Sequence, residues 1–368
     1  MAQDEHAAVR PPLRPGRAGP SLWGVAATYM GTVVGAGFAS GQEVLRFFSQ
    51  FGGRGTGGVL LAALLLMAGG AAICELGRRT RARSFGDALL TLAGPLVGRL
   101  LDGTMAFLLF GGMVVMTAGS GALFQEHLGL ANWLGSAVLV LAAVATVAFG
   151  LRGVVAANRV VVPLLVTAVL AVSISTVVAR GIHLGWRWWQ PGAAAHPSWG
   201  VATALYASYN LFLSLGVLAP LGAGTQSLRT VVAGGILGGM GLGVAALAVH
   251  LAVLSSLPDS AALAIPMLEA ARSLPPWART GYALVLFAEI YTTAVANLFA
   301  LERRLTPRQA TRAGLWRAMV LAGMGILALL ASRLGFPRLV VTIYPLAGYV
   351  GFLVLLGLPV ALWRTRAL

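Results

Sequence analysis

The chain has 368 residues, of which 58% are hydrophobic and only 10% are charged, and its formal net charge is +15. A soluble domain carries about 25% charged residues, so this composition excludes an ordinary soluble enzyme and predicts a protein embedded in a lipid bilayer. All 26 basic residues are arginines, which excludes a lysine-dependent phosphate loop. The arginines lie in short segments between apolar runs, as membrane loops require, so we expect no nucleic-acid partner.

Ten apolar runs follow a polar N-terminal segment. Residues 1–20 are rich in proline and arginine and predict a disordered tail. The apolar runs are long enough to cross about 30 Å of hydrocarbon. They lie near 22–48, 57–77, 103–123, 133–150, 154–179, 198–221, 228–257, 279–301, 313–332 and 338–363. The sequence therefore predicts an all-α polytopic membrane protein with ten transmembrane helices.

The order of the spans and loops predicts two halves of five helices. We expect a first repeat over 21–180, an extracellular loop over 181–197, a second repeat over 198–363 and a tail over 364–368. A repeat with an odd number of spans crosses the membrane in the opposite direction the second time, which is an inverted repeat. Most arginines fall on one side, so the positive-inside rule predicts cytoplasmic N- and C-termini.

The middle of the first span contains four glycines, Gly31, Gly35, Gly37 and Gly41. Each glycine costs about 1 kcal/mol relative to alanine in a helix interior. Irregular backbone at membrane depth persists only where it lines a cavity or is packed in protein. The pattern predicts a break near residues 34–37, which would free carbonyl groups for a cation and amides for an anion. The alternative is dense packing of an unbroken helix through small residues.

The glycine segment and the ten-span layout resemble the uncharacterized YkvI-type bacterial membrane proteins. More distantly, they resemble the amino acid, polyamine and organocation transporters with the LeuT fold. The first-helix pattern of sodium-coupled members of that wider group matches Gly31, Val34, Gly35 and Gly37 in order. The resemblance implies a LeuT-like 5+5 inverted repeat with discontinuous helices 1 and 6. It also implies a multi-pass protein of the bacterial cytoplasmic (inner) membrane.

The resemblance also assigns roles to residues of the first span. The carbonyls of Gly31 and Val34 would ligate one sodium ion, and the amides near Ala36 and Gly37 would meet a substrate carboxylate. Phe38 stands where the family pattern has an asparagine that is linked to a second sodium ion. The expected substrate-binding residues of this span are Ala36, Gly37, Phe38 and Gly41.

Glu43 lies one turn into the outer half of the first span. One interpretation is that its carboxylate gates the site or binds a cationic group. The other is an extracellular ion pair with Arg46 or Arg54. The sequence leaves both open.

The sixth span, the counterpart of the first, carries polar residues at its middle. The pattern predicts a second break at residues 208–210, with Ser208, Tyr209 and Asn210 forming part of the substrate wall. The alternative is hydrogen bonding between helices without a ligand.

Two other ionisable groups within the spans have structural interpretations. Glu75 lies beside Arg78 and Arg79 and predicts an ion pair at the membrane surface. His250 in the seventh span is expected to be a buried histidine with satisfied hydrogen bonds, and the alternative is a proton shuttle.

The eighth span contains Glu289, two adjacent hydroxyls at Thr292 and Thr293, and Asn297. A glutamate at the centre of a membrane helix costs roughly 2.5 kcal/mol or more unless it is paired or protonated, so Glu289 is a candidate cation ligand or proton carrier. The resemblance places Thr292, Thr293 and the Glu289 carbonyl on the same sodium ion as the first helix. The alternative is that the threonines bond to their own backbone and that Glu289 is neutral within a polar network.

Together these observations predict a secondary active transporter of a small organic solute, with an amino acid or a related carboxylate or amine favoured. Coupling to one sodium ion or to protons by alternating access is expected, with no cofactor and no enzymatic activity. The alternatives are a ligand-sensing receptor or a channel, and an intramembrane serine hydrolase using Ser40 and His250. The expected partners are a small-molecule substrate and the lipid bilayer, and the oligomeric state is open.

Overall fold

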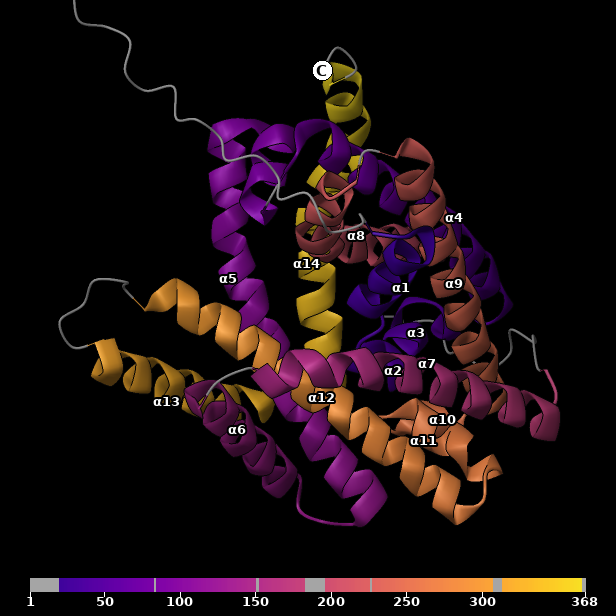
Figure 1. Cartoon of the computed structure of the whole chain (residues 1–368). Helices are drawn as coiled ribbons and strands as arrows, with labels where there is room; N and C mark the ends of the chain where they lie inside the picture. The colour runs from indigo at the N-terminus through magenta and orange to yellow at the C-terminus, as the bar shows by residue number, and fades with distance from the viewer. Residues whose placement is uncertain are drawn as a thin grey trace, which may run out of the picture.

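The computed structural model describes residues 20–82, 84–149, 152–182, 196–225, 227–306 and 313–365. The N-terminal tail, most of the loop predicted at 181–197 and the last residues of the C-terminal tail lie outside the described residues. The regular elements are helices (Figure 1). They are α1 (Leu22–Val33), α2 (Ala36–Ala39), α3 (Gln42–Phe47), η1 (Ser49–Phe51), α4 (Gly53–Thr80), α5 (Phe85–Leu128), α6 (Asn132–Phe149), α7 (Arg152–Arg180), α8 (Trp199–Ala223), α9 (Leu228–Ser255), α10 (Asp259–Ala262), α11 (Pro266–Ala270), η3 (Ala271–Ser273), α12 (Pro276–Leu305), α13 (Ala313–Ser332) and α14 (Phe336–Arg364).

In the described part of the chain, nine helices are long and apolar enough to cross a membrane, namely α4 to α9 and α12 to α14. The first span is built from α1, α2 and α3 in succession, so the expected total of ten spans is confirmed. Its predicted break is confirmed as well, because Val34 (φ −72°, ψ 101°) and Gly35 (φ −123°, ψ −173°) are extended between α1 and α2. A second interruption follows at Gly41.

The sixth span is α8, and it runs without interruption from Trp199 to Ala223. The prediction of a break at residues 208–210 is therefore wrong. The polar side chains there are satisfied without unwinding the helix. The Ser208 hydroxyl donates to the carbonyls of Leu205 (3.0 Å) and Gly348 (2.8 Å), and the Asn210 amide donates to the Tyr206 carbonyl (2.9 Å).

Four helices of the first half pack against their counterparts in the second half. In the first half α1, α4, α5 and α6 contact α8, α9, α12 and α13 of the second half, respectively. This pairing is the arrangement expected when an inverted repeat folds around a common centre. It places the middle of the broken first span inside the bundle, between helices of both halves.

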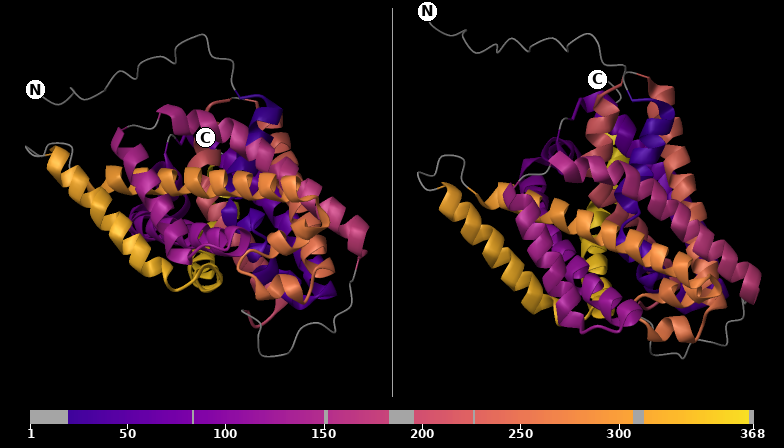
Figure 2. Two further views of the ribbon diagram at one scale, coloured as in Figure 1. Left: turned by 90° about the horizontal axis from the view of Figure 1, so that it is seen from below. Right: turned by 60° about the horizontal axis from the view of Figure 1, so that its bottom comes forward.

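The first transmembrane span begins and the last one ends at the same face of the molecule, here called the terminal face. Gly224, just after α8, lies beside Pro20, just before α1. The Arg79 guanidinium at the end of α4 donates to the Leu362 carbonyl near the end of α14 (3.0 Å). Figure 2 shows the start of α1 and the end of α14 at the same end of the bundle.

The face opposite the terminal face is closed over the outer half of the first span. Nearly every residue from Ala36 to Gln50 is buried, whereas α1 is partly exposed. The segment between α9 and α12, which contains the short helices α10 and α11, forms the cover. The Met267 amide donates to the Ser40 carbonyl (3.0 Å), and the Glu126 carboxylate accepts from the amides of Ala264 (2.6 Å) and Ile265 (3.0 Å).

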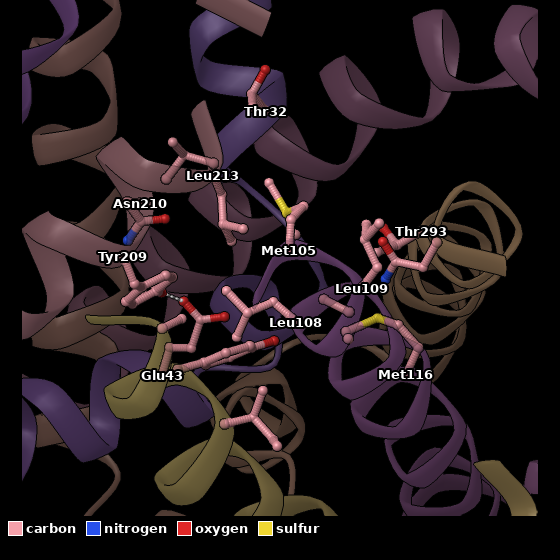
Figure 3. Close-up of a pocket in the computed structure, with 18 residues that line it drawn as sticks. Thr32, Glu43, Met105, Leu108, Leu109, Met116, Tyr209, Asn210, Leu213 and Thr293 are labelled. Atoms are coloured by element: carbon pink, nitrogen blue, oxygen red, sulfur yellow. Dashed lines mark hydrogen bonds between the residues drawn. The ribbon is translucent and has the colours of Figure 1, made fainter. Parts of the chain in front are cut away.

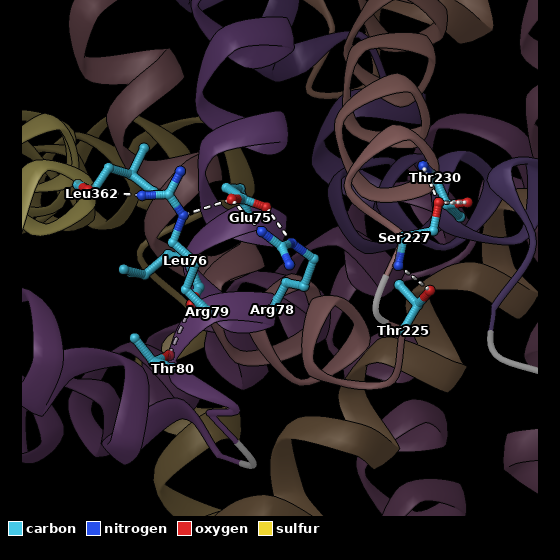
Figure 4. A network of polar contacts seen from close by, with 9 residues as sticks. All are labelled: Glu75, Leu76, Arg78, Arg79, Thr80, Thr225, Ser227, Thr230 and Leu362. Carbon is cyan, nitrogen blue, oxygen red and sulfur yellow. Dashed lines mark hydrogen bonds and ion pairs between the residues drawn. The ribbon is translucent and has the colours of Figure 1, made fainter. Parts of the chain in front are cut away.

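A network of charged groups ties α4 to α14 at the terminal face (Figure 4). The predicted ion pair is confirmed, because Arg78 and Arg79 donate to the Glu75 carboxylate at 2.6 Å and 2.5 Å. The carboxylate is buried rather than at the surface, with 5% of Glu75 exposed. Because Arg79 also bonds to Leu362, the network links two spans.

Replacing Glu75 by glutamine is expected to destabilise the fold by about 2 kcal/mol, since the two guanidinium groups lose the charged partner that balances them. The measurement is the thermal unfolding midpoint of the detergent-purified protein. Asp259→Asn is the control, because this carboxylate is exposed at the start of α10. Equal midpoints for Glu75→Gln and the wild type would contradict the expected role.

Candidate functional site

A cavity of about 280 Å³ lies at the break in the first span. Its walls come from both sides of that break, from α3, and from α5, α8, α12 and α14. Ligand pockets are usually 300–1,000 Å³, so this space suits a small solute. The cavity lies at the meeting point of the two five-helix halves.

One pole of the cavity is acidic and aromatic. The Tyr209 hydroxyl of α8 donates to the Glu43 carboxylate of α3, and the Tyr344 ring of α14 lies beside the same carboxylate at Gly37. The two tyrosine rings stack with centroids 5.2 Å apart and planes 13° apart. Three separate spans therefore hold one buried carboxyl group in place. Figure 3 shows Glu43 and Tyr209 together on one side of the cavity.

The backbone of the first span explains why Glu43 reaches back to the break. Gly41 adopts a left-handed conformation (φ 79°) that a residue with a side chain rarely adopts, and it redirects the chain into α3. Gly37 has no Cβ, and a Cβ there would lie 2.0 Å from Glu43 Oε1. The carboxyl group therefore rests directly against the backbone of α2.

The ion-pair interpretation of Glu43 is not supported. Among the described residues, the ion pairs include neither a Glu43–Arg46 nor a Glu43–Arg54 contact. The Gln42 amide oxygen, in the orientation that satisfies its hydrogen bonds, accepts from Arg46 Nε at 3.0 Å. Glu43 faces the cavity instead, which favours the interpretation as a gate or a ligand for a cationic group.

The wall of the cavity between the Glu43–Tyr209 pair and Thr293 is apolar. It is formed mainly by Met105, Leu108, Leu109 and Met116 of α5, with Ile343 of α14. Figure 3 shows Met105, Leu108 and Leu109 between the Glu43–Tyr209 pair and Thr293. A bound solute would therefore contact polar atoms at its ends and hydrocarbon along its body.

The predicted substrate residues divide into two groups. Ala36, Tyr209 and Asn210 line the cavity, and Gly37 contacts the Glu43 carboxyl. The others lie elsewhere, because Ser208 bonds to α14, Phe38 is fully buried outside the lining, and Gly41 packs against Met267. Ser208, Phe38 and Gly41 therefore do not line the cavity, and a contact of these residues with the substrate stays a prediction. A hydrogen bond between helices occupies Ser208, burial in the core occupies Phe38, and close packing against Met267 occupies Gly41.

Of the predicted cation ligands, only Thr293 lines the cavity. Its hydroxyl donates to Glu289 Oε1 (3.3 Å), and the Thr292 hydroxyl donates to the Glu289 carbonyl (3.2 Å). Val34 is buried outside the lining, and the Cα of Gly31 faces Val162 of α7. The five-residue sodium cage stays a prediction.

Glu289 itself is a buried carboxyl group with an unused oxygen. Only 4% of the residue is exposed, and its Oε2 has no hydrogen-bond partner in the described part of the chain. Buried polar atoms are normally hydrogen-bonded, so such an atom is suited to a proton or a bound cation. Its neighbour on the same helix face, Thr293, opens onto the cavity.

Tyr344 and Asn297 line the cavity, and neither has a role in the site that was predicted from the sequence. Tyr344 lies in the apolar tenth span, where one tyrosine is not distinguishable from a packing residue. Asn297 shares a helix face with Glu289 and Thr293, and its side chain lies against Gly112 of α5. The only signal for Asn297 in the sequence is the spacing of four residues that separates Glu289, Thr293 and Asn297.

Ser40 and His250, the pair that an intramembrane serine hydrolase would use, each bond to other residues. His250 contacts the hydroxyls of Ser49 (2.9 Å) and Thr56 (3.1 Å). The Ser40 hydroxyl donates to the Gly37 carbonyl (2.9 Å). This agrees with the interpretation of His250 as a buried histidine with satisfied hydrogen bonds.

The chain is similar to a membrane protein known from its sequence and to several solved structures. No model of a known protein family matches the chain. The uncharacterized membrane protein YkvI of Bacillus subtilis is 32% identical over 326 residues, which cover 89% of this chain and 92% of YkvI. The solved structure of MhsT in complex with L-phenylalanine has a TM-score of 0.61 and 17% identity, covering 95% of this chain and 99% of MhsT.

A third similar protein is a Na⁺-coupled sialic acid symporter in its substrate-bound outward-open state. It has a TM-score of 0.61 and 13% identity, covering 93% of this chain and 79% of the symporter. At these identities the similarity to the two solved structures shows the fold alone. That fold is the LeuT fold, as the sequence resemblance implied.

Proposed function

The chain belongs to the family of the Bacillus subtilis membrane protein YkvI, and from this membership and the LeuT fold we propose that it is a secondary active transporter of a small organic solute. An amino acid or a related amine or carboxylate is the favoured class of solute. The bound L-phenylalanine of the similar MhsT structure supports a solute of that size.

The observation that carries this proposal is the place of the cavity. It lies against the interrupted backbone of the first span and is bounded by helices of both five-helix halves. A small rotation of one half against the other would open such a site to one face and then to the other, which is alternating access. The closed face over α2 and α3 supports the assignment of this conformation to one end of that cycle.

We assign the coupling cation, sodium or a proton, to the Glu289 region. The unpartnered Oε2 and the hydroxyls of Thr292 and Thr293 offer hard oxygen ligands, which sodium prefers. A carboxyl group can alternatively carry a proton. The relationship to a bacterial membrane protein supports a location in the bacterial inner membrane, and the arginine distribution supports cytoplasmic termini.

Ion flux across proteoliposomes tests the transport proposal. Sodium-22 uptake and the internal pH dye pyranine are followed while each of the twenty L-amino acids, and the amine formed by removing its carboxylate, is added outside. A transporter gives saturable flux with at least one compound. Specific binding without flux for any compound would favour a ligand sensor, and flux that does not depend on any solute would favour a channel.

The assignment of the cation is tested by substitutions in α12. Thermal unfolding in sodium chloride against potassium chloride should show a sodium-specific stabilisation of about 2.7 kcal/mol at a hundredfold excess over Kd, which Thr293→Ala removes. For proton coupling, sodium has no effect and Glu289→Gln lowers pH-driven flux about tenfold or more. Wild-type ion dependence in both variants would contradict the assignment, and Asp259→Asn serves as the control.

A further inference from the structure

The polar atoms at the acidic pole of the cavity are acceptors. Glu43 contributes a carboxylate. The Tyr209 hydroxyl donates its one hydrogen bond to that carboxylate, so toward a solute the Tyr209 oxygen can only accept hydrogen bonds. The Asn210 amide donates to the Tyr206 carbonyl, so its Oδ1 remains as an acceptor. Figure 3 shows that oxygen on the cavity side of Asn210. A group that only donates hydrogen bonds complements this set.

The charge of the pole points in the same direction. Among the described residues that line the cavity, Glu43 is the single acidic side chain, and none is arginine, lysine or histidine. Glu43 is 5% exposed and is in no ion pair among the described residues. A carboxyl group buried in this way is either protonated or paired with a positive charge, and a bound ammonium group would supply that charge from within the cavity.

A substrate carboxylate would meet the wrong partner here. The family resemblance places that carboxylate at the amides near Ala36 and Gly37. In this structure Glu43 Oε1 already lies against Gly37, at 2.0 Å from the position of a Cβ. A second carboxylate beside it would face a like charge in a site of low dielectric constant.

We propose that the transported solute is recognised through an ammonium group that binds Glu43, Tyr209 and Asn210, and that a carboxylate on the solute is not required. The three acceptors match the three donors of a primary ammonium. The apolar wall of Met105 and Leu108 receives a hydrocarbon body. This inference rests on the proposed function and names its substrate class as small apolar amines.

Matched compounds test the role of each charged group. Isoamylamine is L-leucine without its carboxylate, and 4-methylpentanoate is L-leucine without its amine. Phenethylamine and 3-phenylpropanoate form a second pair with a larger body. Each is added to the detergent-purified protein in potassium buffer at neutral pH, and the apparent Kd is measured from the shift of the thermal unfolding midpoint.

We expect an amine of at least one pair to bind and its carboxylate counterpart not to bind. Glu43→Gln should weaken amine binding about 100-fold, since it removes one partner of a buried charge pair. Glu43→Asp keeps the charge and should keep the preference for amines at lower affinity, which guards against a loss caused by misfolding. Asp259→Asn is expected to bind like the wild type, because this carboxylate lies outside the cavity.

Two results would overturn the inference. One is the absence of Glu43-dependent stabilisation by both amines, and the other is binding of the carboxylates at equal or higher affinity. The flux assay separates this failure from failure of the transport proposal. If solute-driven flux survives Glu43→Gln, the transport proposal stands and the amine site is disproved. If amines bind in a Glu43-dependent manner but drive no flux, the amine site stands and the transport proposal is disproved.

Discussion

Replacing Gly77 by alanine is expected to destabilise the fold by about 3 kcal/mol, at the upper end of what overpacking costs. α4 and α8 cross there at backbone contact. A Cβ on Gly77 would lie 2.0 Å from the Ala219 carbonyl oxygen, and a Cβ on Gly222 would lie 2.0 Å from the Cys74 carbonyl oxygen. Because each obstacle is backbone, no side-chain rotation relieves the overlap and the two helices must separate.

Gly57→Ala in the same helix is the matched control for Gly77→Ala. Its Cβ would meet no atom within 4 Å, so a neutral or slightly stabilising effect is expected, in line with the greater helix propensity of alanine. The measurements are the yield of monodisperse protein in detergent and the thermal unfolding midpoint. If Gly77→Ala unfolded at the same temperature as Gly57→Ala, the close crossing of α4 and α8 would be disproved.

Replacing Gly37 by alanine is expected to weaken solute binding about 100-fold while leaving the fold intact. The new methyl group would occupy the position of Glu43 Oε1 and approach Tyr344 Cε2 at 3.0 Å. The carboxyl group is the end of a flexible side chain, so it can move away at little cost to stability. A displacement of about 1 Å in a positioned group can cost about 100-fold, and a loss of that size in isoamylamine affinity is expected.

Gly35→Ala controls for the general effect of a methyl group at the break. No atom lies within 4 Å of a Cβ on Gly35, and its extended backbone accommodates an alanine. Its apparent Kd for isoamylamine should be about tenfold or more below that of Gly37→Ala. Equal losses in the two variants would show that the break tolerates no side chain at all, and that the contact with Glu43 is not the cause.

The transmembrane organisation follows closely from the sequence. Hydrophobic length alone fixed the ten spans, because each must satisfy its backbone within about 30 Å of hydrocarbon. The break in the first span was predictable for a similarly local reason, since four glycines in one helix weaken it. The Glu75 ion pair was predictable because residues three and four apart share one helix face.

The expectations for the sixth span and for Ser208 failed because they depended on distant partners. Polar residues in the middle of a span are compatible with an unwound segment or with hydrogen bonds to a neighbouring helix. The Gly348 carbonyl of α14 decides between these two by accepting the Ser208 hydroxyl. That contact joins residues 140 positions apart, and no local pattern reports it.

The sequence by itself therefore determined that this protein lies in a lipid bilayer, where its spans are, and that the first span is broken at its centre. These features depend on hydrophobic length and local backbone preferences. Only the tertiary structure decided what lies at that break. Gly41 turns α3 so that Glu43 returns to Gly37, and α8 and α14 bring Tyr209 and Tyr344 to the same carboxyl group. The charge of the site is set by this convergence of distant segments, which hydropathy and spacing do not encode.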